Sequence, residues 1–266
     1  MAQPLKSALI KLLGFGDAFL TSATPGEQIS TLLQALHPRL AAKPLIRIGP
    51  AGDGGYLLPD DLVGIEACFS PGVGLLSGFE AECAERGMNV YMADRSVAGP
   101  GASHPRFHFT KKYLGVTTND DFMTLDDWVA SAALNADSDL LLQMDIEGFE
   151  YEVILGASDR LMHRFRVIVA EFHDLDQFWN AAYFKLVSRA FAKILQSHIC
   201  VHIHPNNFSL PLNKAGLSIP PLVEISFLRY DRAFGAGYAR NFPHPLDSDT
   251  TGRAHLPLPK CWWKQS

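Results

Sequence analysis

Residues 65–74 read IEACFSPGVG, a short apolar run that is followed at once by two closely spaced glycines. The run over residues 65–70 predicts a buried strand, and residues 79–87 predict a helix with its charged positions outward. Between them, Gly72 and Gly74 would let the backbone approach a ligand and leave the N-terminus of the helix facing it. The segment therefore predicts the unit of strand, binding turn and helix from which α/β folds are built.

The same alternation of strands and helices continues along the chain. The other predicted strands cover residues 89–93, 106–109, 140–144, 166–172, 199–204 and 222–230, and the other predicted helices cover residues 27–40, 125–133, 147–155 and 178–196. This order predicts a Rossmann-like α/β fold: a mainly parallel, twisted sheet with helices on both faces. The last two strands follow each other without a helix, so we expect an antiparallel hairpin at the sheet edge.

The expected parts of the chain are a helical segment packed on the domain at residues 1–45, the α/β domain at residues 46–232 and a Pro-rich tail at residues 233–266. Residues 6–20 predict an amphipathic helix rather than a signal peptide, because Lys11 and Gly14 interrupt the apolar residues. A tail of this composition is either disordered or docked, and Trp262 and Trp263 favour docking.

Composition excludes several classes of protein. The formal net charge of −5, with no basic run longer than Lys111-Lys112, gives no reason to expect a nucleic-acid partner. The four cysteines contain no CxxC pair, which argues against a zinc ribbon and fits a reducing compartment. No apolar run reaches the roughly 20 residues of a membrane-spanning helix. We therefore expect a cytoplasmic protein without a transmembrane segment, and the oligomeric state stays open.

Asp94 ends the strand predicted at residues 89–93 and lies twenty residues after Gly74. An acid in this place can accept hydrogen bonds from the two hydroxyls of an adenosine ribose. Two glycines alone also fit an ordinary tight turn, but together with this acid they predict a nucleoside cofactor. Ser70, Gly72, Gly74 and Asp94 are the candidate cofactor contacts.

The third glycine of a dinucleotide-binding loop is missing here. Ser77 stands in its place, and Gly78 comes one residue late. A dinucleotide needs the close contact of helix and strand that this glycine allows, whereas S-adenosylmethionine has no pyrophosphate to bind. The loop therefore favours S-adenosylmethionine over NAD.

Asp145 follows the apolar strand predicted at residues 140–144, within the motif MDIEGFE. It should face the crevice at the carboxyl edge of the sheet, where ligands of open α/β sheets bind. The alternative is that Asp145, Glu147 and Glu150 only cap and charge the next helix. We prefer that alternative for Glu150 and a functional role for Asp145.

Glu171 and His173 stand at the end of the next strand, in the motif AEFHD. Neighbouring strands would bring Glu171 close to Asp145, so the two carboxylates could hold a divalent cation, or one could act as a general base. Glu171 fits a structural carboxylate equally well. His173 is a second candidate base, although a single histidine is more often structural.

His202 and His204 alternate on one face of a predicted strand, in the motif HIHPNN. A zinc site would need a third ligand, and the sequence offers none at a readable spacing. Lining of the substrate pocket is the better expectation for this pair.

Several of these segments together resemble the FkbM-type methyltransferase family. The most specific is DIEGFEYEV at residues 145–153; the others are VAEFH at 169–173, TLDD at 124–127, RIG at 47–49, DGGY at 53–56, HPNN at 204–207 and PHPLD at 243–247. The resemblance runs from about residue 47 to the C-terminus.

The resemblance implies a class I methyltransferase fold with S-adenosylmethionine as the methyl donor. It implies that Gly72, Gly74 and Asp94 contact the cofactor and that Asp145 and Glu171 belong to the active site. Many relatives methylate hydroxyls of sugars or natural products, and some related sugar methyltransferases use Mg²⁺. The cofactor loop here lacks the acid that is common in this fold, and Asp53 in the preceding turn could take its place.

The sequence thus predicts an S-adenosylmethionine-dependent O-methyltransferase that acts on a sugar, a glycan or a natural product. The catalytic candidates are Asp145, Glu171 and His173, with Asp145 and Glu171 as possible Mg²⁺ ligands. An NAD-dependent sugar-modifying enzyme and a non-catalytic nucleoside-binding module are the alternatives.

Overall fold

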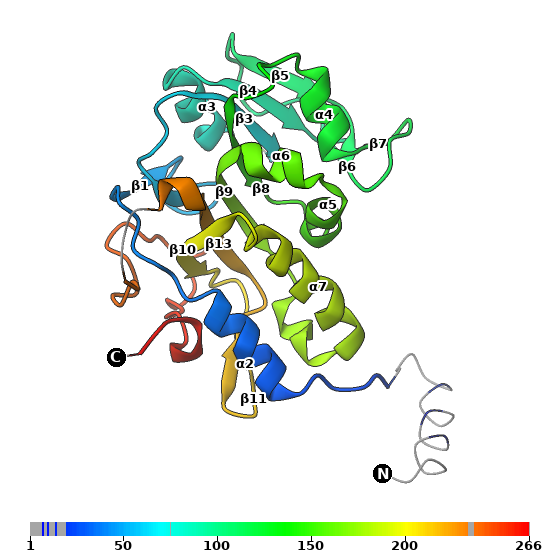
Figure 1. The fold of residues 1–266 in the computed structure, drawn as a ribbon, viewed down its shortest axis with the longest axis vertical. Coiled ribbons are helices and arrows are strands. Elements are labelled where there is room, and N and C mark those ends of the chain that lie inside the picture. Colours follow the sequence, from blue (N-terminus) through cyan, green and yellow to red (C-terminus); the bar gives the residue numbers. More distant parts are fainter. Residues whose placement is uncertain are drawn as a thin grey trace.

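The computed structural model describes residues 20–74, 76–233 and 237–265, together with Ser7, Ile10 and Gly14. The amphipathic helix expected at residues 6–20 otherwise lies outside the described residues. The core is a seven-stranded sheet in the order β10-β13-β9-β8-β3-β4-β5 (Figure 1). Its strands are β3 (Ile65–Pro71), β4 (Asn89–Ala93), β5 (Phe107–Thr110), β8 (Asp139–Met144), β9 (Phe165–Phe172), β10 (His198–Pro205) and β13 (Val223–Arg229). All seven were predicted from the sequence.

Strand β13 alone runs against the rest of this sheet. It pairs antiparallel with both β9 and β10, whereas the remaining neighbours pair in parallel. The expected antiparallel pair of β10 and β13 is confirmed, but β13 lies inside the sheet and β10 forms the edge. The long connection between β10 and β13 contains a small hairpin of β11 (Leu212–Lys214) and β12 (Leu217–Ile219). After it, the chain returns as β13 between β10 and β9. The result is a Rossmann-like, mainly parallel sheet, as expected.

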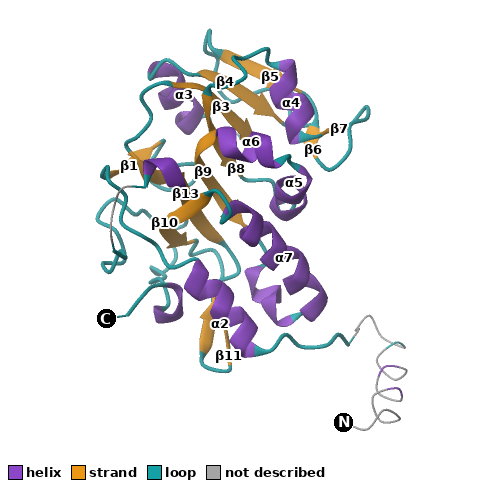
Figure 2. Cartoon of the chain, viewed as in Figure 1, coloured by secondary structure: helices purple, strands orange, loops and turns teal. Residues whose placement is uncertain are grey.

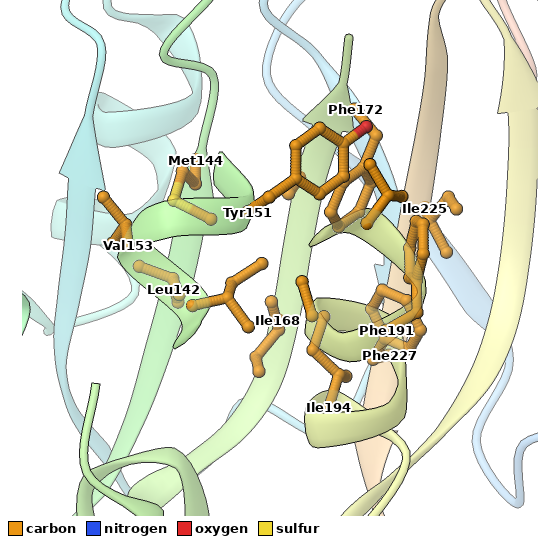
Figure 3. Close-up of a cluster of buried hydrophobic side chains, with 14 of the residues drawn as sticks. Leu142, Met144, Tyr151, Val153, Ile168, Phe172, Phe191, Ile194, Ile225 and Phe227 are labelled. Carbon is orange, nitrogen blue, oxygen red and sulfur yellow. The ribbon is translucent and has the colours of Figure 1, made fainter. Parts of the chain in front are cut away.

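Each face of the sheet has its own hydrophobic core. The larger core packs under α2 (Gly26–Ala35), α4 (Leu125–Ser131), α5 (Glu150–Gly156), α6 (Asp159–Arg164) and α7 (Ala181–Ile194). Figure 2 shows α5, α6 and α7 in front of the sheet, and Figure 3 shows Tyr151, Phe172, Phe191 and Phe227 gathered between α5, α7 and the strands. Helices therefore dominate this face.

The opposite face is covered by α3 (Gly78–Glu85) and by a hairpin of β1 (Leu45–Ile48) and β2 (Tyr56–Pro59). The hairpin lies over β9, β10 and β13, and the hydroxyl of Ser226 in β13 donates a hydrogen bond to the carbonyl of Leu57. The sequence predicted a glycine-rich turn here but not the two strands. A further short parallel pair, β6 (Tyr113–Leu114) with β7 (Phe122–Met123), also went unpredicted.

Three predicted helices differ from the structure by three residues or more at one end. The helix expected at residues 178–196 is divided at Asn180, whose side chain caps α7 by accepting hydrogen bonds from the backbone of residues 182 and 183; the 3₁₀ helix η1 (Leu175–Trp179) precedes it. The helix expected from residue 147 begins only at Glu150, because Glu147 and Gly148 have φ values of +57° and +98°. The first helix ends at Ala35, so Leu40 lies outside it and is exposed.

The C-terminal tail packs on the domain, as its tryptophans indicated. Trp262, in the 3₁₀ helix η3 (Lys260–Trp262), is fully buried, and its indole N–H donates a hydrogen bond to the carbonyl of Ser218 at 3.0 Å. The helix α2 contacts η3, so the two terminal segments meet on the same core. In the part of the chain that the structure describes, no helix has both the length and the apolar character needed to cross a membrane.

Candidate active site

The predicted site residues meet where the parallel strands end. A cavity of about 700 Å³ lies over the carboxyl ends of β3, β8 and β9, and it is lined by Asp53, Gly72, Gly74, Asp94, Asp145 and Glu171, with Tyr56, Glu80, Gln143, Glu147 and Asn206 among the others. A second cavity of about 370 Å³ adjoins it and shares Gly72, Asp94, Ser96, Asp145 and Glu147. Ligands of open α/β sheets bind at this edge.

Gly72 is the glycine that the turn requires. Its φ is +89°, and a Cβ added to it would lie 1.6 Å from the carbonyl oxygen of Asp145. The loop after β3 therefore crosses the end of β8 at a distance that only glycine permits. Gly74 differs, because its φ lies outside the left-handed region and the nearest atom to an added Cβ, the backbone nitrogen of Leu76, is 3.9 Å away.

Asp94 connects the ends of β3 and β4. One carboxylate oxygen accepts hydrogen bonds from the backbone N–H and the hydroxyl of Ser96, both at 2.6 Å. The other accepts a hydrogen bond from the backbone N–H of Val73 at 3.2 Å. These bonds fix the carboxylate at the boundary of the two cavities, both of which Asp94 lines.

Ser70 does not line the cavity, contrary to its place among the predicted cofactor contacts. It is fully buried in β3, and its hydroxyl lies 2.6 Å from carboxylate oxygen Oε1 of Glu80 and 2.6 Å from amide oxygen Oε1 of Gln143. A hydroxyl has one proton to donate, so one of these contacts needs a second donor. Burial raises the pKa of Glu80, which favours the protonated carboxyl that can donate to Ser70. Ser70 thus positions Glu80 and Gln143.

Glu80 is a site residue that the sequence did not reveal. It is the third residue of α3, where a charged side chain was expected to point outward, but it is buried and lines the larger cavity. It brings an acidic side chain to the glycine loop, which has none of its own. The signal that could have revealed Glu80 is its position in the first turn of the helix that follows the glycine loop.

Asp53 lies in the turn between β1 and β2 and reaches the larger cavity. The guanidinium of Arg47 holds this turn, donating hydrogen bonds to the carbonyls of Pro50 and Gly52 at 2.7 Å and of Gly55 at 2.9 Å. Asp53 is thereby available as a second acid near the glycine loop, as the sequence suggested.

Asp145 and Glu171 extend from neighbouring strands into the same cavity, as predicted. The pairing of Met144 with Ala170 puts them next to each other at the strand ends. Burial and the nearby charge of Glu171 raise the pKa of Asp145 to about 8. Burial also raises the pKa of Glu171, although Oε1 of Glu171 accepts a hydrogen bond from the side-chain amide of Asn206 at 2.9 Å.

His173 is held between carboxylates rather than standing alone. Its Nδ1–H donates a hydrogen bond to Oε1 of the fully buried Glu150 at 3.0 Å. Its Nε2 lies 3.7 Å from Oδ1 of Asp145 and 3.5 Å from Oε2 of Glu147. Burial alone would lower the pKa of His173, but the bond to Glu150 and the charges of Glu150 and Asp145 raise it to about 9. Glu150 is thus more than a helix cap.

A metal ion would find its donors in a different set from the predicted pair. Asp145, Glu147 and His173 each offer one ligand atom, and these three atoms lie within 4.8 Å of one another. Glu171 is not in this group. The left-handed backbone conformation of Glu147 brings its side-chain carboxylate to His173. No spacing rule in the sequence could reveal this contact.

His202 and His204 lie away from both central cavities. His202 is 2.8 Å and His204 is 3.5 Å from the carboxylate of Asp247, and all three side chains are buried. The pair therefore holds the tail against β10. The expectation that these histidines line the substrate pocket was wrong for the cavity at Asp145; His204 instead borders a separate cavity of about 350 Å³ against the tail.

Comparison with known proteins gives one family. Residues 77–200 match the model of the methyltransferase FkbM domain, a span that contains Asp94, Asp145, Glu147, Glu171 and His173. No curated protein matches the chain significantly in sequence.

Similarity to solved structures is found only at low identity and low TM-score. A chain of the fibrillarin/Nop5p complex is 9% identical over 63% of this chain and 74% of that chain, with a TM-score of 0.37. The 23S rRNA methyltransferase ErmE is 10% identical over 81% of this chain and 72% of its own, with a TM-score of 0.35. A putative methyltransferase from an antibiotic biosynthesis pathway of Anabaena variabilis is 12% identical over 57% and 62%, with a TM-score of 0.28.

These TM-scores carry no argument about function, and the fold class rests on the sheet order itself. The family match supplies the activity: a methyltransferase, whose family implies S-adenosylmethionine as the donor. Over residues 77–200, this chain is similar to the methyltransferase FkbM domain.

Proposed function

We propose that this protein transfers a methyl group from S-adenosylmethionine to a hydroxyl of an uncharged acceptor such as a sugar, a glycan or a natural product. The observation that carries the proposal is the meeting of two cavities at Asp94 and Asp145. A two-substrate reaction needs both substrates bound side by side with the reacting atoms in line, and such positioning supplies about 7–11 kcal/mol of the barrier at best.

The cofactor fits the smaller cavity and the boundary at Asp94. The walls there are largely apolar, with Tyr113, Leu114, Phe122, Ile146 and Phe149, which suits the faces of an adenine ring. Asp94 would accept hydrogen bonds from the ribose hydroxyls. The methionine part would then extend along Gly72 into the larger cavity, toward Glu80 and Asp53.

The acceptor would occupy the rest of the larger cavity, beside Asp145 and Glu171. None of the described residues around this cavity is Lys or Arg, whereas Asp53, Glu80, Asp94, Asp145, Glu147 and Glu171 are acids. Because this lining supplies no cationic side chain to pair with an anionic acceptor, it favours an acceptor without phosphate groups. Tyr56, Gln143 and Asn206 add neutral hydrogen-bonding groups, as a polyhydroxyl acceptor needs.

In the reaction, the acceptor oxygen forms a bond to the methyl carbon while the bond from that carbon to the sulfonium sulfur breaks. The sulfur keeps the electron pair and becomes a neutral thioether, and the hydroxyl proton must leave the acceptor. We assign this proton to the ionised carboxylate of Asp145, which would accept it as general base; removal of such a proton is worth about 10²–10⁴-fold in rate.

The test has two steps, and neither requires the acceptor to be identified beforehand. Calorimetric titration of the purified chain with S-adenosylmethionine should give one site, and NAD should give none. The chain is then incubated with S-adenosylmethionine carrying a labelled methyl group and with libraries of neutral, amino and phosphorylated sugars and of hydroxylated natural products. Transfer to nitrogen or carbon, read from the methyl carbon shift of the product, would refute the assignment to oxygen.

A further inference from the structure

We infer that Asp145, Glu147 and His173 form a binding site for a divalent transition-metal ion, with Mn²⁺ preferred over Mg²⁺. The three donor atoms come from two adjacent strand ends, β8 and β9, and lie within 4.8 Å of one another. The separations of 3.5 and 3.7 Å from the imidazole Nε2 to the two carboxylates are close to the spacing of ligands around one ion, given metal–ligand bonds of about 2.0–2.2 Å.

The imidazole is already set in the orientation that a metal ligand needs. Glu150 takes the Nδ1–H, so Nε2 is the nitrogen that faces Asp145 and Glu147. A histidine ligand commonly donates its other ring N–H to a carboxylate in this way, and the partner fixes the ring. Oε1 of Glu150 is itself fixed by the backbone N–H groups of Ile146 at 3.1 Å and Gly148 at 3.2 Å.

The backbone of His173 is held from the other side. Its carbonyl oxygen accepts hydrogen bonds from the hydroxyls of Tyr151 at 2.7 Å and Tyr183 at 3.2 Å. Tyr151 is fully buried in the core under α5. The ring and the backbone of His173 are therefore both fixed by hydrogen bonds.

The surroundings favour positive charge at Nε2. The carboxylates of Asp145 and Glu147 lie on the Nε2 side of the ring and that of Glu150 lies on the Nδ1 side, so a cation at Nε2 would have two negative groups beside it. Glu147 is 87% exposed in its side chain and can adjust to the ion, whereas Asp145 is mostly buried. The open coordination positions would face the two cavities, both of which contain Asp145 and Glu147.

The donor set selects the ion. Carboxylates suit Mg²⁺, Ca²⁺ and Mn²⁺, whereas imidazole favours first-row transition metals, so a mixed set with one imidazole favours Mn²⁺ over Mg²⁺. Bound beside the acceptor, the ion would supply Lewis-acid polarisation of the acceptor oxygen. That role rests on the proposed function, but the binding itself does not.

The experiment is titration of the full chain with Mn²⁺, followed by calorimetry and by electron paramagnetic resonance. We expect one Mn²⁺ per chain, with Mg²⁺ binding more weakly. Electron spin echo modulation should show a coupled nitrogen, and Glu147→Gln should weaken Mn²⁺ binding at least about 10-fold, in the range of lost metal-site groups. Because Glu147 is exposed, this variant should fold. Glu152→Gln, which removes a nearby exposed acid on α5, is the matched control and should leave the affinity unchanged.

Two further variants decide between arrangements. His173→Gln should remove the nitrogen signal, and Glu171→Gln should keep it. If Glu171→Gln loses Mn²⁺ binding and Glu147→Gln keeps it, the ion is bound by the pair Asp145 and Glu171 instead, and the proposed site is wrong. Absence of Mn²⁺ binding at millimolar concentration, or a complex without the nitrogen signal, would overturn the proposal. Titration with S-adenosylmethionine on the same samples tests the proposed function separately, so failure of one is distinguished from failure of the other.

Discussion

Replacing Gly72 by alanine should damage both stability and cofactor binding, and the structure gives the size of the effect. The new Cβ would lie 1.6 Å from the carbonyl oxygen of Asp145, whereas real Cβ atoms stay at least 3.0 Å from such atoms. The two backbone segments must therefore separate by about 1.4 Å. The φ of +89° adds a cost of about 1–2 kcal/mol for a residue with a side chain.

That displacement acts directly on the site, because the atom that must move belongs to Asp145. A misplacement of about 1 Å costs on the order of 10²-fold in rate. We expect Gly72→Ala to lower the free energy of unfolding by about 2 kcal/mol or more and to weaken S-adenosylmethionine binding at least about 10-fold. Denaturant unfolding and calorimetric titration measure the two quantities on one sample.

Gly74→Ala is the matched control. The position has an ordinary backbone angle and 3.9 Å to the nearest atom, so alanine should leave the unfolding midpoint unchanged or slightly raised. The motif alone would suggest that glycine is required at position 74, but the structure predicts that alanine is tolerated there. The reasoning would be refuted if Gly72→Ala unfolded at the same midpoint as the unsubstituted chain. It would also be refuted if Gly72→Ala and Gly74→Ala lost the same amount of stability.

Asp94, Asp145 and the buried His198 allow three further tests. Asp94→Ala should weaken S-adenosylmethionine binding by about 1–3 kcal/mol, or roughly 5- to 150-fold by calorimetry; unchanged affinity would remove Asp94 from the site. Asp145→Asn should lower turnover at least about 10²-fold while the melting temperature changes little, whereas a helix-capping role predicts normal turnover, since asparagine caps as well as aspartate. Burial lowers the pKa of His198 to about 4 in the folded state, whereas the unfolded chain takes up the proton near pH 6.5. The free energy of unfolding should therefore be unaffected by His198 above pH 6.5 and fall by on the order of 3 kcal/mol as the pH falls from 6.5 to 4. Denaturant unfolding at pH 7 and pH 4.5 should show this loss, and His198→Gln should reduce it; parallel curves would contradict it.

The sequence predicted the seven strands of the sheet because each is a short segment rich in apolar residues. Strands buried on both faces, such as β9 and β13, are apolar along most of their length and stand out from their polar surroundings. The hairpin of β1 and β2 was missed for the opposite reason. Its strands have four residues each, and their burial depends on β9, β10 and β13, which are distant in sequence.

The strand-end acids of the site could also be predicted, because the end of an apolar run is visible in the sequence. Asp94, Asp145 and Glu171 were found in this way. Glu80 was not, since an acid early in a helix ordinarily faces solvent, and here its burial depends on the hydroxyl of Ser70 in the neighbouring strand. Glu147 was assigned to the start of a helix, because nothing local reveals the left-handed turn that brings it to His173.

The division of the site between segments bears on how its specificity arises. Asp94, Asp145, Glu147 and His173 lie within residues 77–200, the part that matches the family model. The walls of the larger cavity that we assign to the acceptor include Tyr56 from the hairpin and Asn206, which follows β10, both outside that part.

Side-chain hydrogen bonds hold both the turn of this hairpin and Asn206. Arg47 fixes the turn that carries Asp53, and the side chain of Asn206 is bonded to Glu171. Loops on a fixed scaffold can change without disturbing the core beneath them. We therefore expect substitutions at Tyr56 and Asn206 to change the acceptor without loss of S-adenosylmethionine binding.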